Sequence, residues 1–299
     1  MAFNFIKFRR VYLVFSAILM IASLFLLFKF GLKPGIDFVG GSILEVKYEQ
    51  ERPSNQEIRD VLKGMDLGDF SVQPTGDKGI ILKMKDLKEE VHQEVVLKLK
   101  ADHQIEEISF ESIGPTIGEE LKSKTTIFVT LSLFAIAIYI IIAFSNVTFP
   151  VKSWQYGLAS LLILAHDVLI PLGVFSVLGK LYDVQVTIPV VTALLTVVGY
   201  AINNVVVVYD RLRENLLRIH VKKEKFEEIA NSAITQTLAR QINTSMTVLF
   251  ALVFILFWGG ETLKYFALAL ILGILAGLYS SIFLAVPMLV SWLKVRKKI

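Results

Sequence analysis

Long apolar runs alternate with polar segments along the chain, and six of the runs are long enough to predict membrane-spanning helices. A helix needs about 20 predominantly apolar residues to cross the hydrocarbon core of a bilayer. The pattern therefore predicts a multi-pass membrane protein whose spans form an all-α bundle. The predicted spans are Val11–Leu32, Thr126–Phe144, Trp154–Leu178, Val186–Tyr209, Ser245–Gly259 and Tyr265–Leu293.

The polar segment between the first two runs has the pattern of a small soluble domain. Strands are predicted over Gly41–Glu49, on both sides of a turn at Thr75–Gly79, and over Ile105–Gly114. Amphipathic helices are predicted after Ser54 and over Leu87–Ala101. The order β-α-β-β-α-β is that of the ferredoxin-like split motif, an α+β fold. We expect a folded module without chemistry of its own.

These patterns divide the chain into three parts. Residues 1–32 hold the N-terminus and the first span, residues 33–123 form the βαββαβ domain, and residues 124–299 hold the other five spans and the C-terminus. The connection 210–244 is charged and helix-prone. It is predicted to form helices on the inner membrane surface or against a partner, with a solvated connector as the alternative.

The distribution of lysine and arginine predicts the orientation. Most of these residues in short flanks lie in the N-terminus, the second loop, the fourth loop and the C-terminus. The other side has only Lys180 and Lys264 in its short loops. Since basic residues accumulate on the cytoplasmic side, both termini are predicted to be cytoplasmic and the βαββαβ domain extracytoplasmic. The first run is too long for a signal-peptide core and is expected to be an uncleaved anchor.

Composition excludes several classes of chemistry. The net charge of +4 reflects the basic inner face, so it indicates no nucleic-acid partner. There is no cysteine, and the four histidines, His92, His103, His166 and His220, lack metal-ligand spacing. No phosphate-binding glycine loop is present. We therefore expect neither an enzyme nor a bound metal or organic cofactor.

One acidic residue, Asp167, stands near the middle of the third apolar run. A charged side chain at the centre of a membrane helix costs on the order of 3 kcal/mol on insertion scales. It can pair with a cation, face a water-filled cavity, or bind and release a proton. No lysine or arginine lies near the centre of another run, so proton handling is favoured and a cation on a partner chain is the main alternative.

Two neighbours of Asp167 can each have a functional or a purely structural role. His166 precedes it and is turned by about 100° around the helix, so it can line the same path or bond to a neighbouring helix. Pro171 follows one turn later, removes a backbone hydrogen bond and can kink the helix. A kink suits a moving element, but it also occurs for packing alone.

The fourth run contains two amides, Asn203 and Asn204. They can bond to another helix or line a polar path with Asp167. Gly199 is expected to allow close approach of a neighbouring helix. Asp210 and Arg211 fall at the predicted cytoplasmic boundary and are interpreted as interfacial anchors.

The last run carries a stripe of small residues, Gly273 and Gly277 followed by Ser280 and Ser281. Such stripes let membrane helices approach closely, although the pattern is weak alone. Tyr279, Ser280 and Ser281 can add hydroxyl groups to the same interior.

Several of these stretches together resemble the SecF family, subunits of the bacterial SecD–SecF protein-export complex. The matching stretches are GIDFVGGS after the first span, AHDV in the third, GYAINNVVVVYDRLREN in the fourth, TLARQINTSMT before the fifth and GLYSSIFLAVP in the sixth. The resemblance covers essentially the whole chain. It implies half of an RND-type transporter, with SecD as the other half, in the bacterial cytoplasmic membrane beside the SecYEG channel.

The resemblance also implies roles for individual residues. The aspartate of the family's AHD motif is Asp167, which the family implicates in proton transport. The run Gly35–Gly41, with Asp37 and Gly40, marks the exit of the first span. Family members commonly have Asn-Asp in the fourth span, where this chain has Asn203 and Asn204. This departure removes a carboxylate, and it puts in doubt any relay that needs an acid there.

The expected function is therefore a proton-motive-force-driven accessory subunit of the Sec translocase. With SecD, SecYEG and other accessory subunits it would promote late-stage export of the translocating preprotein, with protons as the coupling ion. Two alternatives stay open, an RND-type small-molecule exporter subunit and a scaffold of the channel complex that transports nothing. Replacing Asp167 with asparagine would be harmless in the scaffold.

Overall fold

The computed structural model describes residues 3–143, 151–218 and 226–296 of the chain. Two compact units make up the chain, a helical unit of Met1–Lys33 with Val129–Ile299 and a sheet unit of Pro34–Phe128. Predicted features at Phe144, His220, Lys222, Lys223, Lys225, Lys297 and Lys298 lie outside the described residues.

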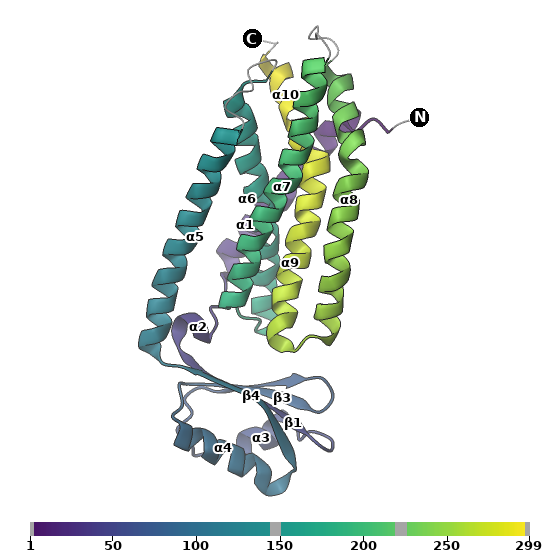
Figure 1. Ribbon diagram of the computed structural model, residues 1–299. Coiled ribbons are helices and arrows are strands. Elements are labelled where there is room, and N and C mark those ends of the chain that lie inside the picture. Colours follow the sequence, from purple (N-terminus) through teal and green to yellow (C-terminus); the bar gives the residue numbers. More distant parts are fainter. Residues whose placement is uncertain (1–2, 144–150, 219–225, 297–299) are drawn as a thin grey trace. The chain divides into compact units, whose positions relative to one another are not determined.

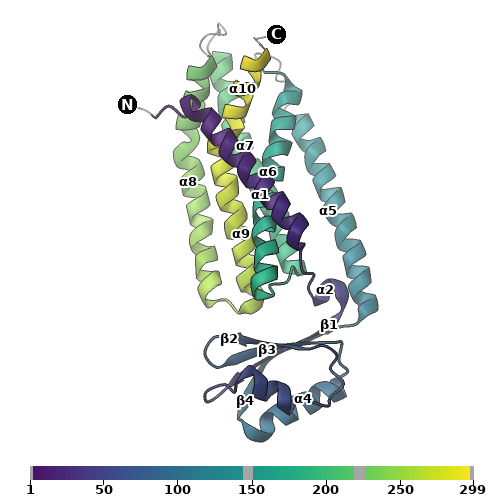
Figure 2. The ribbon, with the colours of Figure 1, turned by 180° about the vertical axis from the view of Figure 1, so that it is seen from behind.

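Within the described residues, six helices are long and apolar enough to cross a membrane, as predicted, so the chain is a multi-pass membrane protein. The helices of the helical unit run side by side (Figure 1), and α1 begins at the end of the unit where α10 stops (Figure 2). The spans are α1 (Arg9–Phe30), α5 (Pro115–Ala143), α6 (Ser153–Tyr182), α7 (Ile188–Arg218), α8 (Phe226–Trp258), and α9 (Glu261–Ser280), which continues through a π-helical turn (Ser281–Ala285) into α10 (Val286–Arg296).

Two spans begin well before their apolar runs. The second span starts at Pro115 rather than Thr126, and the fifth at Phe226 rather than Ser245. The added turns are rich in polar side chains. Hydropathy therefore gives no signal that the helix continues there. The fifth helix consequently takes in much of the stretch 210–244 that the sequence assigns to a loop.

The last span is the central helix of the helical unit. α9 packs against α6, α7 and α8. In its most apolar window, within Leu263–Leu293, 67% of residues are buried, against 11% for the window of the first span. Small side chains at Ala267, Ala269 and Ala285 are fully buried and let the neighbouring helices approach.

The sheet unit contains four antiparallel strands in the order β2-β3-β1-β4. Along β1, Leu44, Val46 and Tyr48 alternate with more exposed residues and are buried. Leu44 pairs with Leu82 on one side and with Phe110 on the other. The elements are α2 (Ile36–Val39), β1 (Gly41–Tyr48), α3 (Asn55–Val61), β2 (Ser71–Thr75), β3 (Gly79–Met84), α4 (Glu89–Asp102) and β4 (Ile105–Ile113).

Local sequence explains the ends of several elements. Ser54 caps α3 by accepting from the backbone N–H of Glu57, whose carboxylate accepts from the N–H of Ser54. This reciprocal pair is a capping box. Pro74 is tolerated in β2 because that strand lies at the edge of the sheet.

Candidate functional site

Asp167 is placed inside the helical unit by its position on α6. Its side chain is fully buried, although it stands in a helix of strongly apolar composition. The residue lies near the middle of the thirty-residue helix, as the sequence predicts. A carboxyl group in this position needs hydrogen-bond partners, because an unpaired buried polar group is costly.

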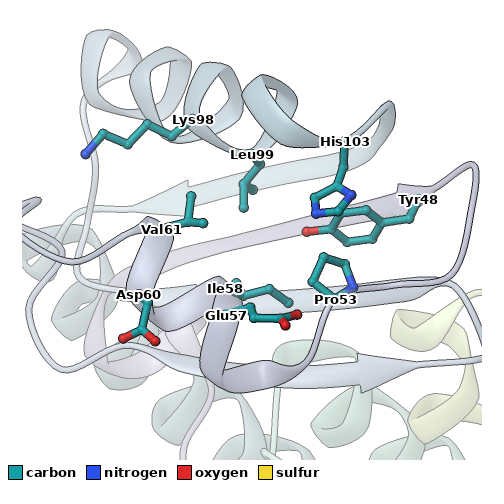
Figure 3. Close-up of a pocket in the computed structure, with 9 residues that line it drawn as sticks. All are labelled: Tyr48, Pro53, Glu57, Ile58, Asp60, Val61, Lys98, Leu99 and His103. Carbon is teal, nitrogen blue, oxygen red and sulfur yellow. The ribbon is translucent and has the colours of Figure 1, made fainter.

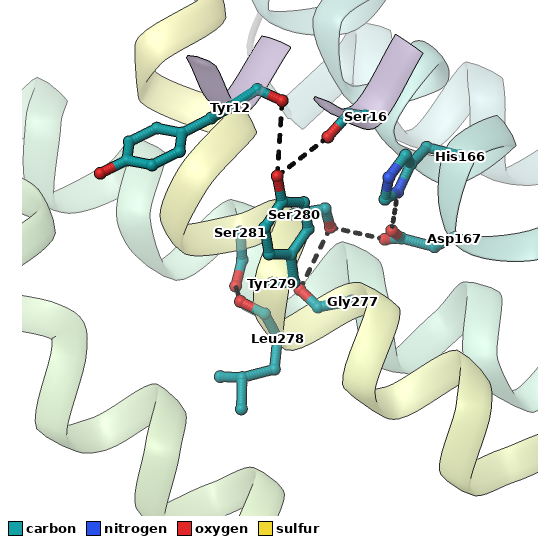
Figure 4. Close-up of polar contacts among 9 residues, drawn as sticks. All are labelled: Tyr12, Ser16, His166, Asp167, Gly277, Leu278, Tyr279, Ser280 and Ser281. Carbon is teal, nitrogen blue, oxygen red and sulfur yellow. Dashed lines mark hydrogen bonds and ion pairs between the residues drawn. The ribbon is translucent and has the colours of Figure 1, made fainter. Parts of the chain in front are cut away.

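Two side chains contact the carboxyl group, one at each oxygen (Figure 4). Nδ1 of His166 lies 2.8 Å from Oδ1, and the hydroxyl of Ser280 on α9 donates to Oδ2 at 2.8 Å. The same hydroxyl also lies 3.2 Å from the carbonyl oxygen of Gly277. A serine has one hydroxyl hydrogen, so Ser280 can donate to only one of these acceptors at a time.

Ser280 is therefore a two-position donor. It can donate to Asp167 when the carboxyl group is charged, and turn to the Gly277 carbonyl when the carboxyl group carries a proton. Rotation of this one hydroxyl group is enough to change the hydrogen bonding of the carboxyl group.

Gly277 lies next to the carboxyl group and close to α7. A Cβ atom at this position would lie 3.6 Å from Oδ2 of Asp167 and 3.3 Å from Cβ of Ala201 on α7. The carboxyl group therefore lies where α6, α7 and α9 meet, and the GxxxG stripe predicted from the sequence lines this meeting point.

Pro171 is buried one turn beyond Asp167 and has no N–H. In a regular helix that N–H would donate to the carbonyl oxygen of Asp167, four residues earlier. α6 nevertheless continues without a break to Tyr182. The helix is also tied to α1 there, since the hydroxyl of Ser176 donates to the Leu26 carbonyl at 2.8 Å and a Cβ on Gly173 would overlap Ser23.

His166 extends the site toward α1. Its ring stacks on Tyr279, with centroids 6.0 Å apart. The Tyr279 hydroxyl accepts from Ser16 at 3.2 Å and donates to the Tyr12 carbonyl at 3.4 Å. Among the described residues, Nε2 of His166 is buried without a hydrogen-bond partner.

The two asparagines predicted together are separated by the structure. Asn204 is 3% exposed, and its Nδ2 has no hydrogen-bond partner among the described residues. Asn203 is exposed on the outside of α7, as is Gly199, whose Cβ position meets nothing within 4 Å in the described chain. Gly199 therefore makes no close helix contact within the described chain, contrary to expectation, because it faces outward.

The remaining predicted residues are not among the contacts described for Asp167. Asp210 is exposed near the end of α7, and Arg211 pairs with Glu214 at 2.8 Å. Gly35 and Asp37 precede β1 in the sheet unit. Gly40 and Gly41 have φ angles of +78° and +136°, which L side chains rarely adopt.

The glycine pair is packed against the start of α5 inside the sheet unit. A Cβ on Gly40 would lie 2.8 Å from Cα of Pro115, and one on Gly118 would lie 2.7 Å from the nitrogen of Gly40. Gly118 was not singled out from the sequence, because it lies before the predicted second span.

Further polar groups near the site were not singled out from the sequence. Gln241 on α8 is 1% exposed, and its Oε1 accepts from the hydroxyl of Ser281 at 2.6 Å. Ser160, two turns before Asp167 on α6, is buried, and its hydroxyl has no partner among the described residues. Gln241 was hidden by its assignment to the fourth loop, and a lone serine gives no hydropathy signal.

The sheet unit contains a separate pocket of about 300 Å³ between α3 and α4 (Figure 3). Ile58 and Leu99 form an apolar floor, while Glu57, Asp60 and Lys98 carry charge at the rim. Burial raises the pKa of the Tyr48 hydroxyl at one end to about 12. The volume is at the lower limit for ligand sites, so the pocket indicates no particular ligand. The residues that line it are Tyr48, Pro53, Glu57, Ile58, Asp60, Val61, Lys98, Leu99 and His103.

In the described part of the chain, no three histidine or acidic side chains are grouped in a way that could hold a metal ion. The chemistry of the helical unit therefore centres on one buried carboxyl group and the hydroxyl, imidazole and amide groups around it.

Comparisons with known proteins agree with this architecture. The family model described as protein export membrane protein SecD/SecF, C-terminal, matches residues 93–295, and the SecD/SecF GG motif model matches residues 25–51. The protein translocase subunit SecF of Thermobaculum terrenum is 36% identical and covers 96% of this chain and 93% of its own length. The SecF of Synechocystis is 34% identical and covers 99% of this chain and 96% of its own length.

Two solved structures share the fold. The crystal structure of SecDF from Thermus thermophilus, described as a translocon-associated membrane protein, has a TM-score of 0.84 and 32% identity over 99% of this chain. A structure of SecDF in a super-membrane-facing form has a TM-score of 0.69 and 33% identity. This chain spans 39% and 40% of those two chains.

These matches confirm the resemblance found in the sequence. The full-length relatives are protein-translocase subunits and not enzymes. The chain belongs to the SecD/SecF family of protein-export membrane proteins, and its full-length relatives are SecF subunits.

Proposed function

We propose that this protein is a proton-driven accessory subunit of the Sec translocase, acting with SecD in the late export of polypeptides across the bacterial cytoplasmic membrane. The observation that supports it best is the buried Asp167 carboxyl group between His166 and Ser280. Both termini would be cytoplasmic and the sheet unit extracytoplasmic. Its strand order also supports the ferredoxin-like class.

The contacts of Asp167 favour a proton over a fixed ion pair. In the described residues its ionic contact is with His166, which is charged only when it holds a second proton. An imidazole nitrogen and a hydroxyl group can each donate to a charged carboxyl group or accept from a protonated one. Moving one charge through 100 mV supplies about 2.3 kcal/mol, so a few protons per cycle can drive a domain movement. No other cofactor is required.

A partner in the membrane would cover polar groups that the helical unit exposes. Asn203 on α7 and Arg240 and Asn243 on α8 are exposed. Arg240 precedes Gln241, which bonds to Ser281 at the depth of Asp167. Because a charge facing lipid at that depth is costly, we expect the polar surface of a partner protein to cover Arg240. The SecDF chains are more than twice the length of this one, which supports SecD as that partner.

SecYEG, other accessory subunits and the preprotein complete the proposed assembly. The sheet unit would transmit the movement to the emerging polypeptide. This assignment differs from a small-molecule exporter, which would carry its substrate without SecYEG, and from a scaffold, which would need no proton.

Asp167→Asn tests the proposal, since asparagine keeps the size of the side chain but cannot carry the charge. The chain and its SecD partner are reconstituted with SecYEG in vesicles, and proton-dependent export is measured. We expect the gradient-dependent part of export to be lost. Asp77→Asn, at an exposed turn of the sheet unit, is the matched control and should export normally.

Export by Asp167→Asn at the wild-type rate would refute the proton role and favour the scaffold. Copurification of the chain without SecD or SecYEG, combined with transport of a small molecule, would favour the exporter.

A further inference from the structure

The last span changes its helical form directly beside Asp167. After Ser280 the chain makes one π-helical turn, Ser281–Ala285, before α10 continues. A π turn has one residue more than an α-helical turn, is rare, and occurs frequently at functional sites. Pro287 favours the irregularity, because it has no N–H to donate to the carbonyl group of Phe283, four residues earlier.

Two buried polar contacts hold the π turn, one at each end. At its start, the hydroxyl of Ser281 donates to Oε1 of Gln241 on α8 at 2.6 Å. At its end, the hydroxyl of Tyr209 on α7 donates to the carbonyl oxygen of Ala285 at 3.1 Å. Ser281, Ala285 and Tyr209 are fully buried and Gln241 is 1% exposed. Figure 4 shows Ser280 and Ser281 pointing to different sides of the helix.

The amide of Gln241 is itself fixed in place. Its Nε2 donates to the hydroxyl of Thr237 at 3.1 Å, and that hydroxyl lies 3.0 Å from the carbonyl oxygen of Ala233, one turn back on α8. With both ends of the amide used, Gln241 offers its oxygen to Ser281 in one orientation. The Ser281 hydroxyl also lies 3.0 Å from the carbonyl oxygen of Leu278 in its own helix, so Gln241 is the acceptor that links it to α8.

The helix register at the π turn affects where Ser280 points. A shift of the helix register by one residue at the π turn would rotate the preceding segment by about 100°. That rotation would take the Ser280 hydroxyl away from Oδ2 of Asp167, 2.8 Å from it in the structure. We propose that Gln241 and Tyr209 are positioning residues, which hold Ser280 against Asp167 by fixing the π turn between α7 and α8.

This inference rests on the proposed proton function of Asp167. It predicts that the effects of removing Gln241 and Ser280 on proton influx do not add up, which packing alone would not give. If Gln241 acts through Ser280, its removal has no further effect once Ser280 is gone. If Gln241 only supports the bundle, the two losses multiply, as independent sites do.

The test uses the chain together with its SecD partner in vesicles of phosphatidylethanolamine and phosphatidylglycerol. Proton influx is followed with a pH-sensitive dye inside the vesicles after a pH gradient is imposed. We expect Gln241→Leu and Ser280→Ala each to lower the influx about five-fold, the equivalent of one hydrogen bond. The double variant should be no slower than Ser280→Ala. Gln236→Leu, an exposed glutamine on the same helix, is the control and should retain wild-type influx.

A second variant keeps the proposal testable if Gln241→Leu does not fold. Tyr209→Phe removes only the hydroxyl group at the other end of the π turn, and it should show the same non-additivity with Ser280→Ala. Its control is Tyr200→Phe, which removes a hydroxyl that bonds to Ser245 between α7 and α8, away from the turn. Monodisperse elution and an unchanged melting temperature show that each variant is folded.

Wild-type influx in Gln241→Leu and Tyr209→Phe, or a roughly 25-fold loss in the double variant, would overturn the inference. In those cases Asp167→Asn would still abolish influx, and the proposed function would stand. Undiminished influx in Asp167→Asn would instead remove the proposed function, and this inference with it.

Discussion

Gly273 of α9 lies directly against the side chain of Val197 on α7, so that a Cβ atom on the glycine would overlap the methyl groups of the valine. The contact sets how closely the two helices pack. One turn further on, Gly277 lies against Ala201 and next to Asp167. The small residues thus determine the distance from α7 to the carboxyl site.

Gly273→Ala should therefore destabilise the helical unit. The added methyl group forces α7 and α9 apart, and overpacking of this kind costs about 1–3 kcal/mol. Gly199→Ala is the matched control on α7, because its Cβ would point into open space. It should leave the melting temperature in detergent unchanged or raise it slightly. Equal melting temperatures for the two variants would contradict the packing argument.

Gly118→Ala tests the packing of the glycine pair in the sheet unit. The new Cβ would lie 2.7 Å from the backbone nitrogen of Gly40, and backbone cannot move aside cheaply. We expect faster hydrogen exchange in α2 and β1, measured by mass spectrometry on the intact chain. Gly114→Ala has open space around it and should behave as wild type. Unchanged exchange in Gly118→Ala would show that the contact is not tight.

His92 ties α4 to β4 and can be dissected by two substitutions. Its ring stacks on Phe110 with centroids 3.7 Å apart, while Nδ1 lies 3.3 Å from Glu89 and Nε2 lies 3.2 Å from Glu107. His92→Phe keeps the stacked ring and loses both polar contacts, at an expected cost of about 1 kcal/mol. His92→Ala loses the ring as well and should lower the stability further. We expect this as faster hydrogen exchange in α4 than in His92→Phe. Equal exchange in both variants would mean that the ring packing contributes nothing.

Acid should act on α4 through Glu89. Hydrogen bonds from Gln93 and then from His92 hold the pKa of this carboxyl group below its ordinary value. A lowered pKa stabilises the fold above the ordinary pKa of a glutamate, and this contribution is lost as the pH falls through the folded-state value. Gln93→Leu removes the 2.6 Å bond, so its α4 should open at a higher pH than in wild type. Gln56→Leu on α3 serves as the control, and coincident acid transitions would disprove the linkage.

The sequence predicted the spans because the bilayer makes apolar length decisive, and it predicted Asp167 because one acid among apolar residues is conspicuous. It could not give the start of α5 at Pro115 or of α8 at Phe226, since the turns beyond the apolar core are as polar as a loop. Gln241 was missed for that reason.

The partners of Asp167 depend on how the helices are rotated. Ser280 was recognised only as a hydroxyl group in a small-residue stripe, and its contact with Asp167 across 113 positions requires the packing of α6 on α9. Asn203 and Asn204 are adjacent in sequence, but a rotation of about 100° puts one inside the unit and the other outside. Periodicity alone does not say which of the two is inside.

The proline at position 171 has a mechanical consequence for the backbone around Asp167. Because Pro171 supplies no hydrogen to the carbonyl oxygen of Asp167, the helix can bend at this point without breaking any further bond of its ladder. The third span is therefore easier to bend beside its buried carboxyl group than a helix with an unbroken ladder would be. Pro171→Ala would restore the backbone hydrogen bond to the carbonyl oxygen of Asp167 and stiffen the helix there, without changing any polar side chain.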